Sequence, residues 1–232
     1  LSNLSTKAEK SNGSWTLTGE KQLVPDAGAA QVFVVAAQSS DGIGLFAVSG
    51  SADPLTTVDT TRRLGRLSLN GTEATPLVGP EETAAVIETT RRRALAALAL
   101  EAVGIAQKAL ELAMEHAKER KQFDKPIGTY QAVSHQIANV FVETELARSI
   151  SYWAAWCVAE DDERAAVAVA AAKSAAAEAA VAACEHSIQV HGGIGFTWEH
   201  ILHRYYKRAQ WIDAFEGHGS RQRAAIAAHL FA

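Results

Sequence analysis

The sequence changes character at Gly79-Pro80, and this change limits the folds open to the chain. Before it, short runs such as SWTLTGEKQLV alternate apolar and polar residues and are separated by turn signals such as Ser-Ser-Asp-Gly. After it, the chain consists almost entirely of helix formers, and Pro80 suits a first helical turn, where its missing N–H would have no partner. The sequence therefore predicts an α+β fold with a β-domain at residues 1–78 and a helical domain at residues 79–232.

The β-domain is expected to form a small sheet or barrel. Trp15 and Leu17 lie on one face of the first long run. Four further runs have the length and composition of strands: QVFVVAAQ, GIGLFAVS, LTTVDTT and GRLSLNGTEATPL. Several short strands with turns between them are typical of such folds.

The helical domain is expected to form an antiparallel four-helix bundle, because long helices with short links pack in this way. The helices are predicted over about Glu81–Glu119, Thr129–Ala159, Asp161–Val190 and Ser220–Leu230, with a short one near Glu199–Tyr206. One stripe of the second helix carries Val133, Ile137, Val140 and Phe141.

Composition narrows the class of protein. Apolar residues make up 48% and charged residues 21% of the chain, as in globular proteins, and a net charge of −4 gives no sign of a nucleic-acid surface. The apolar tract Ala165–Ala183 is mostly alanine, so we expect no membrane insertion. Cys157 and Cys184 lie in apolar helical sequence and are predicted to be buried free thiols in a reducing, cytoplasmic setting. The N-terminus shows no signal-peptide pattern.

The link between the first two helices, ERKQFDKPIGTYQ, is the first candidate site. Arg120 offers a planar guanidinium suited to a pyrophosphate, Gln122 and Gln131 can donate or accept hydrogen bonds, and Phe123 could cover a ring. By themselves these residues favour a simpler interpretation, a solvated helix end in which Arg120 lies near the C-terminal helix dipole.

The second candidate site, QVHGGIGF at residues 189–196, ends the third helix. Gly192-Gly193 would allow a backbone to approach a ligand closely, or would simply form a helix C-cap, and the segment alone favours the cap. His186 and His191 have no third ligand at a suitable spacing, so we expect no metal site.

The third candidate site, AFEGHGSRQR at residues 214–223, places one carboxylate, Glu216, before a helix. An acid at that place would ordinarily cap the helix, where the dipole stabilises its charge. A catalytic base would instead need apolar surroundings, which Trp211 and Phe215 could supply. The residues leave both interpretations open.

Together and in this order, the three segments resemble the acyl-CoA dehydrogenase family. TKAEKSNGSWTLTGEKQLV resembles the family's β-domain, ALEAVGIAQKALELAMEHAKERKQF resembles its long helix and following loop, and QVHGGIGFTWEHILHRYYKRAQ with FEG resembles its C-terminal signature. The resemblance covers nearly the whole chain, and the combination is more specific than any one segment. It implies the family fold, FAD as cofactor and α,β-dehydrogenation of an acyl-CoA thioester.

By this resemblance, Glu216 is the base that removes the α-proton while the β-hydrogen leaves as hydride to the flavin. The base must face the flavin across the substrate, so its geometry matters first. Other members of the family carry the acid on the first long helix. The matching place here is close to Ala94, which closes that alternative.

The resemblance also implies a flavin site shared across a dimer. The β-domain of one subunit holds the isoalloxazine, and the bundle of the other subunit reaches over to hold the pyrophosphate and adenosine. The matching residues of the bundle are Arg120, Gln131, Gln189, Gly192 and Gly193, with Gln122 and Phe123 beside them.

Several family features are replaced or not found. The N-terminal helical domain and a Thr-Glu-Pro-Gly-Ala-Gly-Ser-Asp-like segment are expected before Leu1 and are not in this sequence. Leu23-Val24-Pro25 replaces the Trp-Ile-Thr that lies against the flavin, and Pro25 cannot donate an N–H. Three other places differ from the family pattern: Lys207-Arg208-Ala209, His218 and Ser220.

The chain thus keeps the residues that serve a neighbour's flavin and lacks several that would hold its own. This asymmetry resembles the family's heteromeric members, some of which act on CoA-linked sterol side chains. We predict a subunit of an FAD-dependent acyl-CoA dehydrogenase, active in a homo- or hetero-oligomer such as a dimer of dimers, with an acyl-CoA substrate and an electron-transfer protein as acceptor. A non-catalytic partner subunit and an oxidase fit the same residues, whereas a cofactor-free interaction domain is disfavoured.

Overall fold

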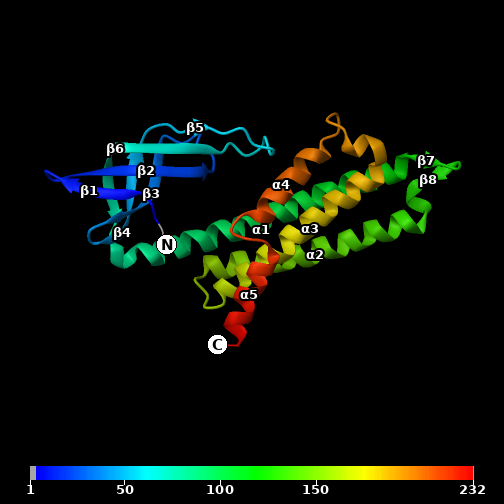
Figure 1. The fold of residues 1–232 in the computed structure, drawn as a ribbon. Coiled ribbons are helices and arrows are strands. Elements are labelled where there is room, and N and C mark those ends of the chain that lie inside the picture. Colours follow the sequence, from blue (N-terminus) through cyan, green and yellow to red (C-terminus); the bar gives the residue numbers. More distant parts are fainter. Residues whose placement is uncertain (1–3, 232) are drawn as a thin grey trace. The chain divides into compact units, whose positions relative to one another are not determined.

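The computed structural model describes residues 4–231, which divide into two compact units between Thr90 and Arg91. The last long strand, β6, ends at Val78, and helix α1 begins at Pro80 (Figure 1). The change from strand to helix therefore falls where the sequence predicts it, while the division into units lies further along, inside α1. The domain bounds 1–78 and 79–232 stay a prediction.

The first unit contains a closed barrel. Its strands are β1 (Lys7–Ser11), β2 (Ser14–Val24), β3 (Val32–Ser39), β4 (Gly42–Ser49), β5 (Asp53–Pro54) and β6 (Gly65–Val78). The strands pair in the ring β1–β2–β6–β4–β3–β1, in which β1–β3 is the parallel pair, and β5 pairs with β6. The interior holds Leu17, Phe46 and Leu69, with Trp15 packed against them. The prediction of a small sheet or barrel is therefore confirmed, and of the two forms the structure shows the barrel.

The expected strand LTTVDTT is wrong, because these residues form a loop between β5 and β6. The buried carboxylate of Asp59 accepts hydrogen bonds from the N–H of Thr61 at 2.9 Å and from its hydroxyl at 2.6 Å. The Thr57 hydroxyl donates to the carbonyl of Asp59 at 2.7 Å. Such short-range bonds between side chain and backbone compete with a β-ladder, so a strand-like composition folds as a turn.

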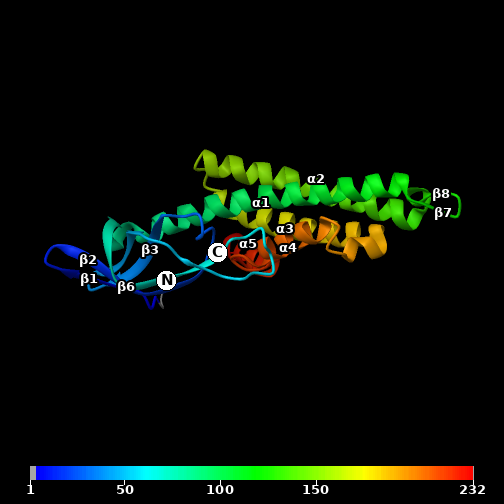
Figure 2. The same ribbon diagram turned by 90° about the horizontal axis from the view of Figure 1, so that it is seen from above.

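The second unit is a helical bundle, and its first helix is the later part of α1 (Figures 1 and 2). It contains the part of α1 (Pro80–Glu119) from Arg91 onward, together with α2 (Gln131–Ala159), α3 (Ala165–His191), α4 (Leu202–Ala214) and α5 (Gly219–Leu230). The links contain β7 (Lys121–Gln122), β8 (Lys125–Pro126) and the 3-10 turns η1 (Ile127–Thr129) and η2 (Gly192–Phe196). Fully buried alanines such as Ala106, Ala172 and Ala180 form much of the core, and their small side chains let neighbouring helices pack closely.

Two details of the bundle differ from the expectation. The short helix predicted near Glu199–Tyr206 is instead α4, which continues to Ala214 because Leu202, Ala209 and Ile212 bury one face in the core. The sequence predicts Phe141 on the apolar stripe of α2, but its side chain is 53% exposed, since it lies about 100° around the helix from the buried Val140.

α3 is the core helix of the bundle. By length and hydropathy alone it could cross a membrane, contrary to the expectation from its alanine content, but 67% of its most apolar window is buried within the fold. Cys157 and Cys184 are buried free thiols, as predicted. Burial raises the pKa of the Cys184 thiol to about 12.

Candidate functional site

The Arg120 segment forms a short hairpin at the end of α1. The N–H of Arg120 donates to the carbonyl of His116 at 2.8 Å, and β7 pairs with β8 directly afterwards. The turn holds Phe123 and Asp124 in the left-handed region, with φ of 51° and 63°. Because Phe123 is 87% exposed, the turn presents its ring to solvent rather than to the core.

The hairpin is fastened to the start of α2. The Tyr130 hydroxyl donates to the carbonyl of Gln122 at 3.1 Å, and the Lys125 ammonium lies 4.5 Å from the centre of the Tyr130 ring. A cavity of about 360 Å³ lies beside the hairpin, lined by residues of α1, the hairpin and α2. Within residues 4–231, Arg120 has no ion pair, so its exposed guanidinium is available to a ligand.

α3 ends in a turn capped by glycine. Gly192 has a φ of 65°, which favours glycine, and its N–H donates to the carbonyls of Ile188 and Gln189. This is the geometry of a helix C-cap. A Cβ added at Gly192 or Gly193 would meet nothing within 4 Å, so the same turn leaves an open surface beside Gln189.

The two segments meet at one end of the bundle. The His116 ring, one turn before Arg120, stacks on the His191 ring with 4.3 Å between centroids, and the His200 ring lies 4.4 Å from that of His191. Burial, and then the neighbouring histidines, lower the pKa of His116 and of His200. This end therefore displays all seven residues that the sequence predicts for the cofactor, each of them exposed: Arg120, Gln122, Phe123, Gln131, Gln189, Gly192 and Gly193.

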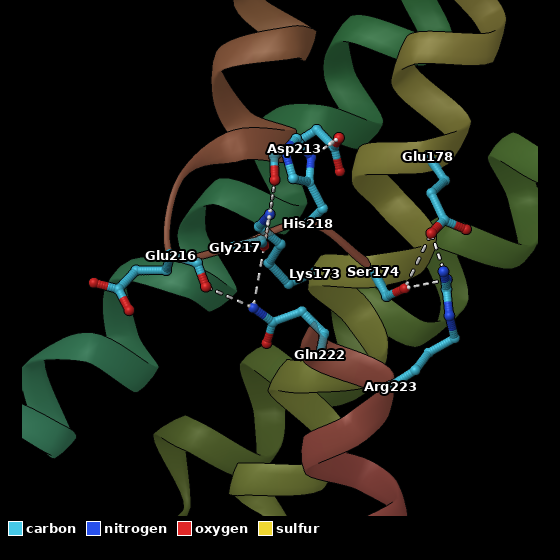
Figure 3. Close-up of polar contacts among 9 residues, drawn as sticks. All are labelled: Lys173, Ser174, Glu178, Asp213, Glu216, Gly217, His218, Gln222 and Arg223. Atoms are coloured by element: carbon cyan, nitrogen blue, oxygen red, sulfur yellow. Dashed lines mark hydrogen bonds and ion pairs between the residues drawn. The ribbon is translucent and has the colours of Figure 1, made fainter. Parts of the chain in front are cut away.

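Glu216 lies in the link between α4 and α5 (Figure 3). It does not cap α5, whose N-cap is His218, so the interpretation as an ordinary helix cap is wrong. Instead, Nε of Arg91 donates to Oε2 of Glu216 at 3.0 Å. The rings of Trp211 and Phe215 stack on each other at 4.8 Å, and the Glu216 side chain remains 37% exposed. Local sequence patterns do not reveal Arg91 as a partner of Glu216, because the two residues are far apart in the chain.

Two buried polar side chains, Lys173 and Gln222, bind the link between α4 and α5 that contains Glu216, here called the Glu216 link (Figure 3). Neither is among the site residues predicted from the sequence. Lys173 of α3 is fully buried, and its Nζ donates to the carbonyls of Asp213 at 2.7 Å and Gly217 at 3.0 Å. Gln222 of α5 donates to the carbonyls of Glu216 at 3.1 Å and Gly217 at 3.4 Å. One signal was available, since a lysine within an alanine-rich core helix needs a buried partner.

Glu216 and the Arg120 hairpin lie towards opposite ends of the bundle. Arg91, the partner of Glu216, lies at the start of the part of α1 that belongs to the bundle, whereas Arg120 directly follows the helix. The stretch of α1 from Arg91 to Glu119 is roughly 40 Å long at about 1.5 Å per residue. Figures 1 and 2 show β7–β8 at one end of the bundle and the link from α4 to α5 well away from that end. These groups therefore form two separate sites.

In the first unit, strand β2 ends at Val24, and Pro25 follows it directly. Leu23 is 64% exposed with a φ of 54°, and Val24 pairs with Gly65 after an irregularity in the register. Pro25 brings no N–H to this surface, and none of the three residues has a hydroxyl. The segment thus offers few donors to a ligand.

Comparison with known proteins identifies the family to which this architecture belongs. A family described as acyl-CoA dehydrogenase, C-terminal domain, matches residues 85–231. The chain belongs to the acyl-CoA dehydrogenase family. The matched region of this acyl-CoA dehydrogenase chain includes both Glu216 and the Arg120 hairpin.

Individual acyl-CoA dehydrogenases resemble the chain over much of its length. Acyl-CoA dehydrogenase IpdE2 of Mycobacterium tuberculosis is 41% identical over 173 residues, which cover 74% of this chain and 47% of IpdE2. The chain therefore spans about half the length of that relative. The solved Tcur3481-Tcur3483 steroid ACAD, in a variant form, is 32% identical with a TM-score of 0.82, covering 96% of this chain and 61% of that chain. The ChsE4-ChsE5 complex of Mycobacterium tuberculosis is 29% identical with a TM-score of 0.85, covering 97% and 62%. The predicted fold is confirmed.

The acyl-CoA dehydrogenases are FAD-dependent flavoproteins, and the Arg120 end has donors that fit this cofactor. Its donors are the Arg120 guanidinium, which has no ion pair among the described residues 4–231, the side-chain amides of three glutamines and the uncrowded backbone at Gly192-Gly193. A guanidinium binds phosphate oxygens in a bidentate manner, and open glycine backbone permits close approach of a ligand. The chemistry of these residues therefore suits the pyrophosphate-containing part of FAD.

Proposed function

We propose that this chain is a subunit of an FAD-dependent acyl-CoA dehydrogenase whose flavin sites are each shared by two subunits. The observation that carries the proposal is the separation of roughly 40 Å along α1 between Glu216 and the Arg120 hairpin. A base and a pyrophosphate-binding arginine so far apart serve different flavins. Each chain then contributes its Glu216 to one site and its Arg120 to another.

In this proposal, Glu216 takes the α-proton of the acyl thioester. Its carboxylate is the reactive group, and it must leave Arg91 to come within hydrogen-bond reach of the substrate. FAD, when bound, supplies the acceptor for the β-hydrogen as hydride. The partial exposure of Glu216 in the single chain ends when substrate and neighbouring subunit cover it, and exclusion of water then favours proton transfer.

Arg120 binds the pyrophosphate in this proposal, and Gln131, Gln189 and the backbone at Gly192-Gly193 orient the adenosine part. Phe123, projecting from the hairpin turn, covers the dinucleotide. All these residues point to solvent within one chain, which fits a cofactor presented by a neighbour.

Assembly is supported by α2, which is apolar on two opposite faces. Val140, Ala147 and Ala154 are buried in the bundle. The opposite face exposes four large apolar side chains, each at least one-third exposed: Val142, Leu146, Trp153 and Trp156. Large apolar side chains that gather on one exposed helix face are typical of a protein–protein interface, so we propose that a homologous subunit covers this face.

The substrate that we propose is the CoA thioester of a lipid or steroid side chain. The support is the 32% identity to a steroid ACAD over 96% of this chain. The similarity to the ChsE4-ChsE5 complex supports an unlike partner subunit. An electron-transfer protein would reoxidise the flavin.

A second candidate is a non-catalytic partner subunit that supplies only the Arg120 half of a FAD site. Two observations favour it: the Glu216 carboxylate is already paired with Arg91, and Pro25 removes a donor from the β-domain. In this case the unlike subunit would carry the base, and Glu216 would be dispensable.

Glu216→Gln in the assembled flavoprotein separates the two candidates. If Glu216 is the base, turnover of acyl-CoA falls by at least about 100-fold, while flavin content per oligomer stays unchanged. Glu163→Gln, which removes an exposed acid between α2 and α3, serves as the control and should keep full activity. Normal turnover in Glu216→Gln would refute the role of the base and favour the non-catalytic subunit.

A further inference from the structure

Lys173 is a fully buried charged residue in the middle of the core helix α3. Its hydrogen-bond partners within residues 4–231 are two main-chain carbonyls, and it has no ion pair with a carboxylate there. Burial is the main cause that lowers its pKa, opposed by the charges of Asp213, Glu178 and Glu216. Burial of an ammonium group is unfavourable, whereas an apolar side chain at this position would pack without that cost. We therefore infer that the two hydrogen bonds of Lys173 fix a backbone conformation that apolar packing alone would not fix.

The two carbonyls that Lys173 binds lie on either side of Glu216. Asp213 belongs to the last turn of α4, where carbonyls have no partner within the helix, and Gly217 follows Glu216 directly. A simple helix cap would need the first bond alone. The second bond, to the carbonyl of Gly217, also fixes the backbone on the far side of the candidate base Glu216.

Gln222 holds the same link from α5. It is 2% exposed, and its Nε2 donates to the carbonyls of Glu216 and Gly217 (Figure 3). The backbone between Asp213 and Gly217 is thereby gripped at three carbonyls by side chains from two helices. Glu216 itself has a φ of 57°, a region that residues other than glycine adopt rarely and keep only when their surroundings impose it.

We propose that Lys173, together with Gln222, is a positioning residue that fixes the backbone of Glu216 and so aims its carboxylate at the substrate. The proposal rests on the proposed function of Glu216 as the base. Lys173 touches neither the carboxylate nor, in this proposal, the substrate, and it acts through the main chain. A small displacement of a reacting group is enough to slow catalysis greatly, so loss of these backbone hydrogen bonds should lower the rate.

The test uses Lys173→Met in the assembled flavoprotein, because methionine is unbranched and apolar and lacks donors. We expect kcat to fall by about 100-fold, as for a base displaced by about 1 Å, with KM changed by less than about threefold. Flavin content should stay at the wild-type level, because the Arg120 end lies far away along α1. Amide hydrogen exchange, a readout independent of activity, should become faster at residues 214–218 and stay unchanged in α1 and α2.

Two further variants keep the test decisive. Thr144→Val removes another buried donor, whose hydroxyl binds the carbonyl of Val140 at 2.7 Å, and it should leave both kcat and exchange at residues 214–218 unchanged. If Lys173→Met does not assemble, Gln222→Leu should show the same loss of kcat and of protection from exchange.

The outcomes distinguish this proposal from the function on which it rests. Suppose that Glu216→Gln is inactive. If Lys173→Met and Gln222→Leu are then fully active, or if neither of these two variants changes the exchange at residues 214–218, the positioning role is overturned and Glu216 remains the base. Active Glu216→Gln overturns the base and the positioning role together. A loss of kcat that Thr144→Val reproduces would mean that Lys173 is merely structural.

Discussion

The Nε atom of Arg91 lies 3.0 Å from Oε2 of Glu216, so the candidate base is paired with a guanidinium of α1. The two side chains are 32% and 37% exposed. Exposed pairs of this kind contribute little to stability, because water screens them and the side chains lose freedom. We therefore expect the pair to orient Glu216 without locking it, so that the proposed substrate would displace Arg91.

A double-mutant cycle of Arg91→Met and Glu216→Gln measures this coupling. We expect a coupling free energy below about 1 kcal/mol in urea unfolding, as for a partly exposed ion pair. A coupling above about 2 kcal/mol would instead make Glu216 a structural anchor, which contradicts its release to substrate.

Arg120→Ala should weaken FAD retention. Loss of a charge-assisted hydrogen bond costs about 1.5–3 kcal/mol, so the Kd for FAD should rise at least about tenfold in a flavin titration of the apoprotein oligomer. Lys108→Ala, which removes a cation from the middle of α1, is the matched control and should leave the Kd unchanged. Equal flavin affinity in Arg120→Ala and the wild type would exclude Arg120 from the cofactor site.

The stacked rings of His116, His191 and His200, here called the histidine stack, lead us to expect that the protein loses stability at mildly acidic pH. Burial and neighbouring rings lower the pKa values of His116 and His200 below the ordinary 6.5 in the folded state. The unfolded chain therefore binds protons first, so stability is complete above about pH 6.5 and is lost as pH falls through the folded pKa values. Nearby Arg120 also lowers the pKa of His116, and Glu119 opposes it.

Thermal unfolding between pH 8 and pH 5 measures the effect of the stack. His200→Phe keeps a ring beside His191 but cannot be protonated, so its melting temperature should fall less at pH 5 than that of the wild type. His229→Phe, at an exposed site in α5, should behave as the wild type. An identical pH dependence in His200→Phe would show that the stack does not govern acid stability.

Leu146→Glu should weaken assembly of the oligomer. Leu146 is 64% exposed on the second apolar face of α2, and a carboxylate buried between subunits would lose its hydration. Sedimentation velocity should show smaller species at micromolar concentration. Ala159→Glu adds the same charge at the exposed end of α2 and should leave assembly intact. An unchanged oligomer in Leu146→Glu would show that this face is not an interface.

Much of the fold could be predicted from local patterns. The alternation in SWTLTGEKQLV and the position of Pro80 predict a strand and a helix start, and both are observed. The loop at LTTVDTT could not be predicted, because β-branched composition favours a strand until the side chain of Asp59 binds its neighbours. The full length of α4 depends on burial of Ile212 in the core, which is a tertiary effect.

The candidate site was predictable only in part. The sequence indicated Glu216 and the Arg120 hairpin through their resemblance to a family. It could not indicate Arg91 or Gln222, since each meets the link between α4 and α5 only after the helices have packed. The alanine-rich surroundings of Lys173 indicate a buried partner, but they do not identify the carbonyls that it binds. The distance between the two candidate sites likewise follows from the unbroken course of α1 and not from any motif.

In the proposed assembly, one chain serves two flavins, with Glu216 at one and Arg120 at another. A crystal structure of the assembled oligomer with FAD would decide whether this arrangement exists. We expect Arg120 to contact the pyrophosphate of a flavin whose isoalloxazine lies in a different subunit, and Glu216 of the same chain to be remote from that flavin. An FAD contacted by both Arg120 and Glu216 of one chain, or lying wholly within one subunit, would contradict it.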